Sequence, residues 1–272
     1  MGSIPEGESG DAVSGLQAYV QQRLASGERQ ILLMTHLVVG YPSLDANRTM
    51  LKIMATNDVD LVELQMPFSE PVADGPIFVR ANQEALAAGL RVDDYFEFFS
   101  EAGELCSFPR LFMGYYNTAF CLGHQTFCTR LAKAGAAGYI LPDLPWEEYG
   151  DLGVTSERHQ LESILLMTPT NTAERLQGLG ARARGFVYAV ARKGVTGEVT
   201  EFEADLYEFL DRCRGATDLP LALGFGLRDG EDLRKLHGRV EIGIVGSALL
   251  SAWEEGGERA YGALIESLAT AR

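Results

Sequence analysis

Short apolar segments alternate with amphipathic segments along most of the 272-residue chain. The apolar segments are rich in Val, Ile, Leu and Phe and are bounded by Gly, Pro or Asp, as is typical of buried strands. They predict strands at residues 31–39, 59–65, 110–113, 138–141, 163–168, 185–191, 219–223 and 241–245.

Between these strands, apolar residues recur every three or four positions, which is the spacing of an amphipathic helix. Ser43 and Thr172 each precede such a segment and are suitable N-caps. The predicted helices are residues 12–27, 44–56, 77–88, 93–103, 125–133, 147–159, 171–179, 202–213 and 228–237, with further helices filling 247–271.

Buried strands joined by helical crossovers form a parallel sheet that is covered on both faces. Eight strand–helix units without an internal linker favour an α/β fold of the single (β/α)8 TIM barrel type, preceded here by an extra N-terminal helix. We therefore expect one TIM-barrel catalytic domain over residues 11–272. Residues 1–10, which are rich in Gly, Ser and Glu, are expected to be a flexible leader.

The composition narrows the possible functions. The net charge of −15 repels nucleic acids and anionic membranes. There is no apolar run of about 18 residues and no secretory signal pattern. Four cysteines follow no metal-binding spacing and are expected to be reduced and partly buried: Cys106, Cys121, Cys128 and Cys213. We expect a cytoplasmic protein that binds neither nucleic acid, nor membrane, nor metal.

The strand at 59–65 carries the first candidate catalytic residue. Strand alternation places Glu63 on the same face as Leu61 and Gln65. An ionised carboxylate on a buried strand is costly unless it is paired or used in chemistry. A second carboxylate, Asp74, lies on the loop that follows. Glu63 is therefore either a catalytic group or a structural ion-pair partner.

Three glycine-bearing segments follow the last three predicted strands, at 192–197, 224–226 and 246–247. Active sites of such barrels lie at the C-terminal ends of the strands, where phosphate often binds in this half. Glycine lets backbone N–H groups approach an anion, and the helix that begins at Ser247 adds its positive dipole end. A single glycine and serine at a helix start is more often only a cap, but the three segments together favour a phosphate site.

The most specific motif runs from Glu63 to Pro76 and reads ELQMPFSEPVADGP. Further motifs follow in the order Tyr115-Tyr-Asn117, Pro142-Asp-Leu-Pro145, Arg192-Lys-Gly-Val-Thr-Gly197, Gly224-Phe-Gly226 and Gly246-Ser-Ala248. Together they resemble the tryptophan synthase alpha subunit, a barrel that splits indole-3-glycerol phosphate into indole and glyceraldehyde 3-phosphate.

This resemblance implies a lyase of L-tryptophan biosynthesis that performs a retro-aldol cleavage. Glu63 would protonate indole C3 and take a proton from the glycerol hydroxyl. Asp74 would accept the indole N–H and stabilise positive charge in the protonated ring. Thr196 would bind Asp74 when the 192–197 loop closes over the substrate, and Tyr188 would lie beside Glu63.

The resemblance also implies binding residues, a partner and a cofactor. The phosphate would be held by Gly197, Gly226, Gly246, Ser247 and Ala248, and the indole pocket would be lined by Phe225, Ile140, Met113 and His36. The partner would be a beta subunit in an alpha-beta-beta-alpha assembly, contacted through Pro67, Glu70 and Asn117. This chain would hold no cofactor, and pyridoxal phosphate would belong to the beta subunit.

Four positions depart from the family pattern. Gln65 replaces a small glycine and is expected to narrow the pocket mouth or to hydrogen-bond Glu63. His36 replaces an apolar aromatic residue, and pocket lining is favoured over a general-base role. Glu70 replaces aspartate in the partner-contact loop, and Lys193 replaces a small polar residue in the closing loop.

Several alternatives stay open at this stage. Asp74 would be a simple turn-former before glycine, Tyr188 a packing residue, and Asp143 a brace between neighbouring loops. Trp146 and Trp253 are expected to anchor packing. At the level of function, the alternatives are an autonomous indole-releasing homologue that needs no partner and a non-catalytic regulatory barrel subunit.

Overall fold

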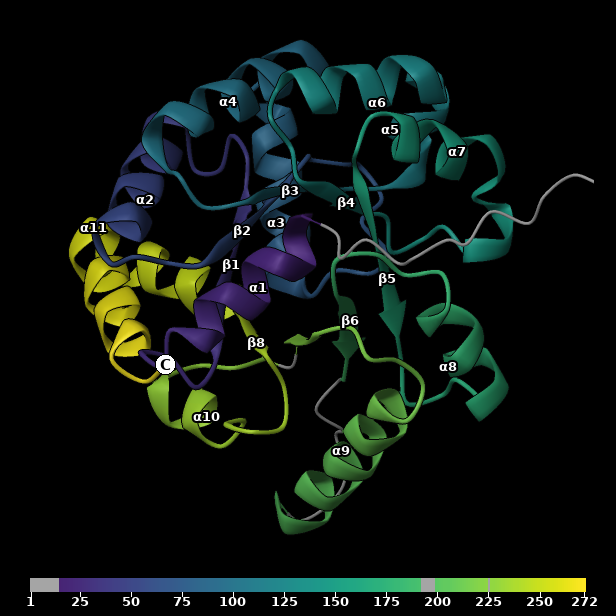
Figure 1. Cartoon of the computed structure of the whole chain (residues 1–272). Coiled ribbons are helices and arrows are strands. Elements are labelled where there is room, and N and C mark those ends of the chain that lie inside the picture. The colour runs from purple at the N-terminus through teal and green to yellow at the C-terminus, as the bar shows by residue number, and fades with distance from the viewer. Residues whose placement is uncertain (1–14, 192–198, 225) are drawn as a thin grey trace, which may run out of the picture.

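The computed structural model describes residues 15–191, 199–224 and 226–272. Within them, parallel strands close into a barrel in chain order, and β8 pairs with β1. Helices surround this barrel (Figure 1). The strands are β1 (Leu32–Val38), β2 (Leu61–Gln65), β3 (Arg110–Met113), β4 (Gly138–Ile140), β5 (Glu162–Met167), β6 (Val187–Val190), β7 (Leu221–Gly224) and β8 (Ile242–Val245). The predicted TIM barrel is confirmed.

The helices agree with the predicted ones, with one addition. They are α1 (Gly15–Ala25), α2 (Leu44–Thr56), α3 (Pro76–Ala87), α4 (Val92–Leu105), α5 (Tyr116–Leu122), α6 (His124–Lys133), the 3-10 helix η1 (Trp146–Glu148), α7 (Gly150–Arg158), α8 (Ala173–Gly180), α9 (Val199–Arg214), α10 (Gly230–Arg234) and α11 (Ser247–Ala269). The segment 147–159, predicted as one helix, is divided into η1 and α7. The leader predicted at residues 1–10 lies outside the described residues.

Helix α5 was not predicted, because much of what holds it lies far away in the chain. Its first backbone N–H, that of Tyr116, donates to both carboxylate oxygens of Asp143, at 2.9 and 3.2 Å. Asp143 follows β4 and therefore braces two neighbouring loops, as one of the open alternatives proposed. The expectation that all four cysteines are partly buried was wrong for Cys121, which is exposed on this helix. Among the helices that the structure describes, none is long and apolar enough to cross a membrane.

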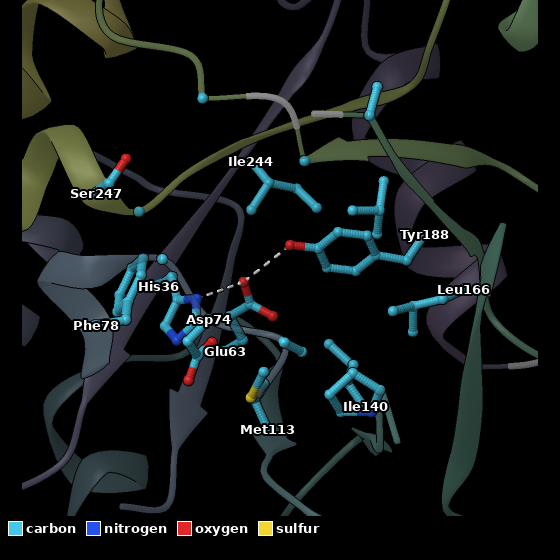
Figure 2. A pocket seen from close by; sticks show the side chains of 18 residues that line it. His36, Glu63, Asp74, Phe78, Met113, Ile140, Leu166, Tyr188, Ile244 and Ser247 are labelled. Carbon is cyan, nitrogen blue, oxygen red and sulfur yellow. Dashed lines mark hydrogen bonds and ion pairs between the residues drawn. The ribbon is translucent and has the colours of Figure 1, made fainter. Parts of the chain in front are cut away.

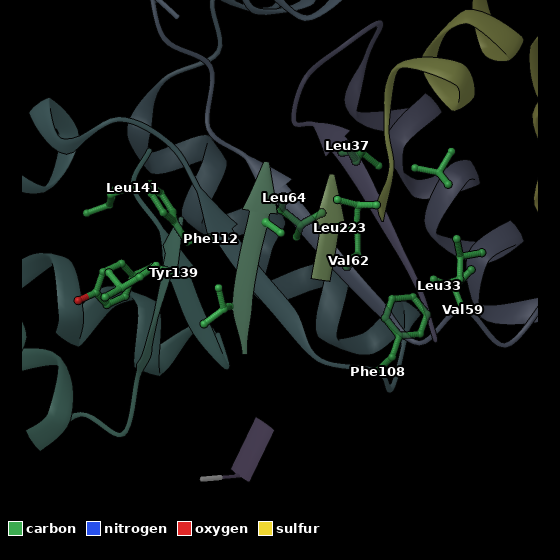
Figure 3. Close-up of a cluster of buried hydrophobic side chains, with 14 of the residues drawn as sticks. Leu33, Leu37, Val59, Val62, Leu64, Phe108, Phe112, Tyr139, Leu141 and Leu223 are labelled. Atoms are coloured by element: carbon green, nitrogen blue, oxygen red, sulfur yellow. The ribbon is translucent and has the colours of Figure 1, made fainter. Parts of the chain in front are cut away.

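Strand alternation separates two apolar cores. Val62 and Leu64 of β2 point outward and pack with the surrounding helices (Figure 3). Leu61 points into the barrel, where it belongs to a second buried cluster that also includes Leu16 and Val20 of α1. Helix α1 therefore closes the N-terminal end of the barrel, across which it lies in Figure 1. This is the extra N-terminal helix that the sequence predicted.

A buried carboxylate fastens this end of the barrel. The side chain of Asp60, immediately before β2, is 0% exposed and forms ion pairs with Arg23 of α1 at 2.7 Å and with Arg272 at 3.1 Å. A third arginine, Arg29, approaches at 3.2 Å. Asp60 also accepts the backbone N–H of Leu33 at 2.9 Å. These contacts tie both ends of the described chain to the first two strands.

We expect Asp60→Asn to lower the free energy of unfolding by about 3–5 kcal/mol, because it leaves buried guanidinium groups without their counter-charge. Urea denaturation of the full chain measures this loss. The matched control is Asp45→Asn. The side chain of Asp45 is 92% exposed and pairs with Arg48. This control should change stability little. Equal effects of the two substitutions would contradict a fastening role for Asp60.

Candidate active site

A cavity of about 260 Å³ opens at the C-terminal ends of the strands (Figure 2). It brings together residues from both halves of the chain, including the last residues of β3, β4 and β7. The predicted site residues that line it are His36, Glu63, Asp74, Met113, Ile140, Tyr188, Gly226, Gly246 and Ser247. Phe225, Thr196 and Gly197 lie outside the described residues, so their predicted roles stay predictions.

Glu63 occupies the middle of β2, with 1% of its side chain exposed. Its Oε1 atom accepts a hydrogen bond from the Tyr188 hydroxyl at 3.4 Å. The same oxygen lies 3.1 Å from Nδ1 of His36, its register partner on β1. Both contacts are drawn in Figure 2. The predicted proximity of Tyr188 to Glu63 is confirmed. Among the described residues both contacts fall on Oε1, which leaves Oε2 for a substrate.

Asp74 lies on the loop between β2 and α3 and is held from two sides. Its Oδ2 atom accepts the side-chain amide of Gln65 at 2.6 Å and that of Asn82 at 3.4 Å. Burial raises the pKa of Asp74, and the opposing effects of charge on His36 and of hydrogen bonds from Gln65 and Tyr115 offset this only in part. Asp74 is thus more than a turn-former, because its carboxylate faces the cavity and has specific partners.

Gln65 was expected to narrow the pocket mouth or to hydrogen-bond Glu63, and it does neither. It is fully buried, and it is not among the described residues that line the cavity. Its Oε1 atom lies 2.8 Å from Nε2 of His36, and its amide nitrogen bonds Asp74. The physical reason is geometric: Glu63 Oε1 already has two partners, and Gln65 is one inward-facing position further along β2.

His36 lines the cavity as predicted, and it also links polar groups. Its ring stacks on Phe78 of α3, with 4.3 Å between the centroids and 25° between the planes. Burial alone would lower the pKa of His36. The negative charges of Glu63 and Asp74, together with hydrogen bonds to Glu63 and Gln65, outweigh burial and raise the pKa above its ordinary value.

The opposite side of the cavity is suited to an anion. Gly246 and Ser247 line the cavity at the start of α11, and this helix start has no side-chain cap, so its first N–H groups are not bound by a capping side chain. A Cβ atom on Gly246 would lie 2.9 Å from the Phe78 ring, so the close approach requires glycine. Gly226 has a φ of +66°, which also favours glycine. Ala248 packs against the outer core, and its predicted phosphate contact stays a prediction.

The residues predicted to contact a partner differ in exposure. Pro67 is buried within this chain, and its predicted partner contact stays a prediction. Glu70 and Asn117 are exposed on the segments after β2 and β3. Two apolar side chains in the same segments are unusually exposed, Val72 by 77% and Phe120 by 68%. Both lie in the same segments as Glu70 and Asn117, which makes these segments the candidate for an interaction surface.

Several apolar wall residues were missed by the sequence reasoning, and the larger ones include Phe78, Leu166 and Ile244. Ile244 had a signal, because alternation along β8 places it inward two positions before Gly246. Phe78 lies four residues after Asp74, on the first turn of α3. The helix itself was predicted at 77–88, but the position of the Phe78 ring in the cavity wall was not. The site as a whole can transfer protons to and from a flat apolar substrate that carries an anionic group.

Comparisons with known proteins agree with one another. A family model described as "Tryptophan synthase alpha chain" matches residues 22–272. The tryptophan synthase alpha chains of Syntrophotalea carbinolica and Desulforapulum autotrophicum are each 44% identical to this chain, over 93% of its length and 99% and 100% of theirs.

Solved structures are similar over nearly the whole chain. Mycobacterium tuberculosis tryptophan synthase superposes with a TM-score of 0.87 at 32% identity, covering 96% of this chain and 98% of that one. Tryptophan synthase subunit alpha from Legionella pneumophila gives a TM-score of 0.85 at 27% identity, with the same coverage of 96% and 98%.

The raised pKa of His36 predicts a pH-dependent contribution to stability. A histidine whose folded pKa exceeds its unfolded value stabilises fully below the unfolded pKa of about 6.5 and loses this contribution as pH rises through the folded pKa. The stability advantage of the wild type over His36→Phe should therefore shrink as pH rises above neutrality. Urea denaturation at several pH values measures it. When both proteins also carry Glu63→Gln, this stability difference should decrease less with pH. A stability difference that increases with pH would contradict the raised pKa of His36.

Proposed function

The chain belongs to the family of tryptophan synthase alpha chains, and on that premise we propose that Glu63 and Asp74 are the two carboxylates that carry out its reaction. Alpha chains of this family cleave indole-3-glycerol phosphate into indole and glyceraldehyde 3-phosphate, so this chain is a lyase of tryptophan biosynthesis. The open question is which of its residues perform each step.

Glu63 is the acid–base group. Cleavage of the bond between indole C3 and the glycerol chain needs a proton delivered to C3 and another removed from the adjacent hydroxyl. A carboxyl group on a strand stays in one place for both transfers, and among the described residues the hydrogen bond and the ion pair of Glu63 both fall on Oε1 rather than on Oε2. The C3–C bond then breaks, its electron pair returns to the ring, and the hydroxyl carbon becomes the aldehyde.

Asp74 stabilises the intermediate. Protonation at C3 leaves positive charge on the ring and makes the ring N–H a stronger donor, which a carboxylate on the cavity wall accepts. Asp74 lines the same cavity as Glu63, and the apolar side chains of Ile140 and Leu166 line it as well. Two carboxylates in one cavity, one on a strand and one on a loop, therefore take different roles.

The phosphate of the substrate lies at the start of α11. The chain carries a net charge of −15, so its overall field does not attract an anion. Local N–H groups and the positive end of the helix dipole at Gly246 and Ser247 supply the attraction instead. The single observation that carries the proposal is that this helix start and both carboxylates line one cavity.

The partner is a tryptophan synthase beta subunit, which would hold pyridoxal phosphate. The contact surface of this chain comprises Glu70, Val72, Asn117 and Phe120, which we call the partner face. Apolar indole formed here would pass to that subunit. The cytoplasmic location stays a prediction.

Glu63→Gln should reduce the rate of indole release by about 10²–10⁴-fold, because the amide cannot exchange the proton while the cavity shape is kept. Indole release from indole-3-glycerol phosphate measures the rate, and binding of inorganic phosphate should remain. The control Glu84→Gln removes an exposed carboxylate of α3 and should retain the wild-type rate. Full turnover by Glu63→Gln would overturn the assignment.

The same assay with and without a beta subunit separates the open alternatives. A partner-dependent alpha chain releases indole slowly alone and faster in the complex. High turnover of the isolated chain would identify an autonomous enzyme, and no turnover in either state would identify a regulatory subunit.

Phe120→Asp should weaken binding of the beta subunit by about tenfold or more, because it places a charge in an apolar contact. Calorimetric titration of the full chain measures the affinity, and indole release by the isolated chain should not change. The matched control is Val154→Asp, on α7, where the valine is also exposed, by 50%. Equal weakening by both substitutions, or by neither, would show that the partner face lies elsewhere.

A further inference from the structure

A continuous chain of polar contacts joins the two carboxylates of the site. From Glu63 Oε1 it passes to His36 Nδ1 at 3.1 Å, and from His36 Nε2 to Gln65 Oε1 at 2.8 Å. It then passes from Gln65 Nε2 to Asp74 Oδ2 at 2.6 Å. The two middle residues come from β1 and β2, and Gln65 is fully buried. Each contact needs one donor and one acceptor, so the orientation of one member determines the next.

The orientation can be read from the Asp74 end. An ionised carboxylate only accepts hydrogen bonds, so the amide of Gln65 turns its NH₂ group toward Asp74. Its carbonyl oxygen then faces His36, and a carbonyl oxygen also only accepts. His36 must therefore carry a proton on Nε2. Gln65 in this way sets the tautomer of the imidazole ring.

The consequence appears at the other ring nitrogen. Without a further proton, Nδ1 would present a lone pair to Oε1 of a buried carboxylate, and the two would repel each other. The distance of 3.1 Å is that of a hydrogen bond, and a hydrogen bond between these two atoms requires a proton between them. That proton belongs either to an imidazolium on His36 or to a carboxylic acid on Glu63.

We propose that His36 is a positioning residue that shares a proton with Glu63, and that Gln65 keeps this proton in place by fixing the tautomer of His36. The proposal rests on the role of Glu63 as the acid–base group. It assigns Oε1 of Glu63 to the shared proton and Oε2 to the substrate.

The shared proton lets Glu63 act in both directions without becoming a bare buried anion. Before the ring is protonated, Oε2 of Glu63 carries the proton to be delivered and Nδ1 of His36 carries the shared proton. When Oε2 gives its proton to indole C3, the proton on Nδ1 shifts to Oε1, and the imidazole becomes neutral. When Oε2 takes the hydroxyl proton during bond cleavage, the proton on Oε1 returns to Nδ1. Each transfer moves one proton along the pair, and the pair ends the cycle as it began.

The surroundings of the ring favour this arrangement. The titratable groups that face His36 are Glu63 on β2, Asp74 on the loop before α3, and Tyr188 on β6 beyond Glu63. Burial and the charge of Glu63 raise the pKa of Tyr188 well above its ordinary value, so this hydroxyl remains a donor to Oε1. Phe78 covers one ring face, and none of the described lining residues is a lysine or arginine.

The tautomer can be observed directly, without any assay of activity. In the full chain labelled with ¹⁵N-histidine, the ring resonances of His36 are identified by their loss in His36→Phe. We expect Nε2 of His36 to carry hydrogen across the neutral and mildly alkaline range. A neutral ring with hydrogen on Nδ1 would mean that the Gln65 amide is reversed and that Asp74 is protonated, and it would overturn the proposal.

The shared proton also has a kinetic consequence. The rate of indole release should fall at high pH, where the pair of His36 and Glu63 loses this proton. Gln65→Met removes the acceptor for Nε2–H, so the ring can turn to the Nδ1–H tautomer and donate to the Glu63 carboxylate without an extra proton. The alkaline limb of kcat for indole release should then move to lower pH by about one unit. Gln65→Glu still accepts from Nε2 but cannot donate to Asp74, so the limb should stay or move higher, while a change in KM reports the lost contact with Asp74.

The control is His159→Phe, which removes a histidine that also pairs with a glutamine, Gln125, outside the cavity at 2.9 Å. Its alkaline limb should match the wild type. A limb that stays in place in Gln65→Met, or that shifts equally in Gln65→Glu, would overturn the role of Gln65. Full turnover by Glu63→Gln would instead refute the proposed function, and the ¹⁵N measurement would still decide the tautomer.

Discussion

The register between β1 and β2 is the constraint on which the site depends. In this parallel pair His36 stands opposite Glu63, and both face into the barrel. A shift of β2 by one residue would turn Glu63 to the outer face, away from His36, and would bring Val62 inward. The apolar pattern prevents this shift, because Leu61 is packed inside the barrel and Val62 and Leu64 pack against the helices. Packing that holds the fold therefore also holds the distance between the two proton-sharing groups.

The same strand region serves stability at one end and chemistry at the other. Asp60, just before β2, is neutralised by arginines at the closed end of the barrel. Glu63, three residues later, has no arginine or lysine among its described contacts and meets a histidine and a tyrosine instead. A buried carboxylate paired with guanidinium groups serves as a structural anchor, whereas one beside groups that exchange protons can take part in chemistry. The two carboxylates thus differ because of their neighbours and not because of their burial.

Much of this could be predicted from the sequence, because it depends on local patterns. Alternation predicted the strands and the inward face of Glu63, and glycines after the last strands pointed to the start of α11. Helix α5 and the partners of Gln65 could not be predicted in this way. The first N–H of α5 is bound by Asp143, 27 positions from Tyr116, and Gln65 bonds a histidine 29 positions away. Contacts of this range follow from the closed barrel, which places distant residues side by side.

Phe78 joins the two halves of the cavity. Its ring stacks on His36, and it also lies where any side chain on Gly246 would have to go. It is carried by α3, which begins two residues after Asp74. The segment from Asp74 to Phe78 therefore contacts the proton-sharing pair through Gln65 and His36, and it contacts the phosphate side through Gly246. A partner that binds the exposed Glu70 and Val72 would contact the chain just before this segment. Binding at the partner face would thus change the position of Asp74 and of the residues beside Gly246 through one short stretch of chain. The strand that holds Glu63 would not have to move.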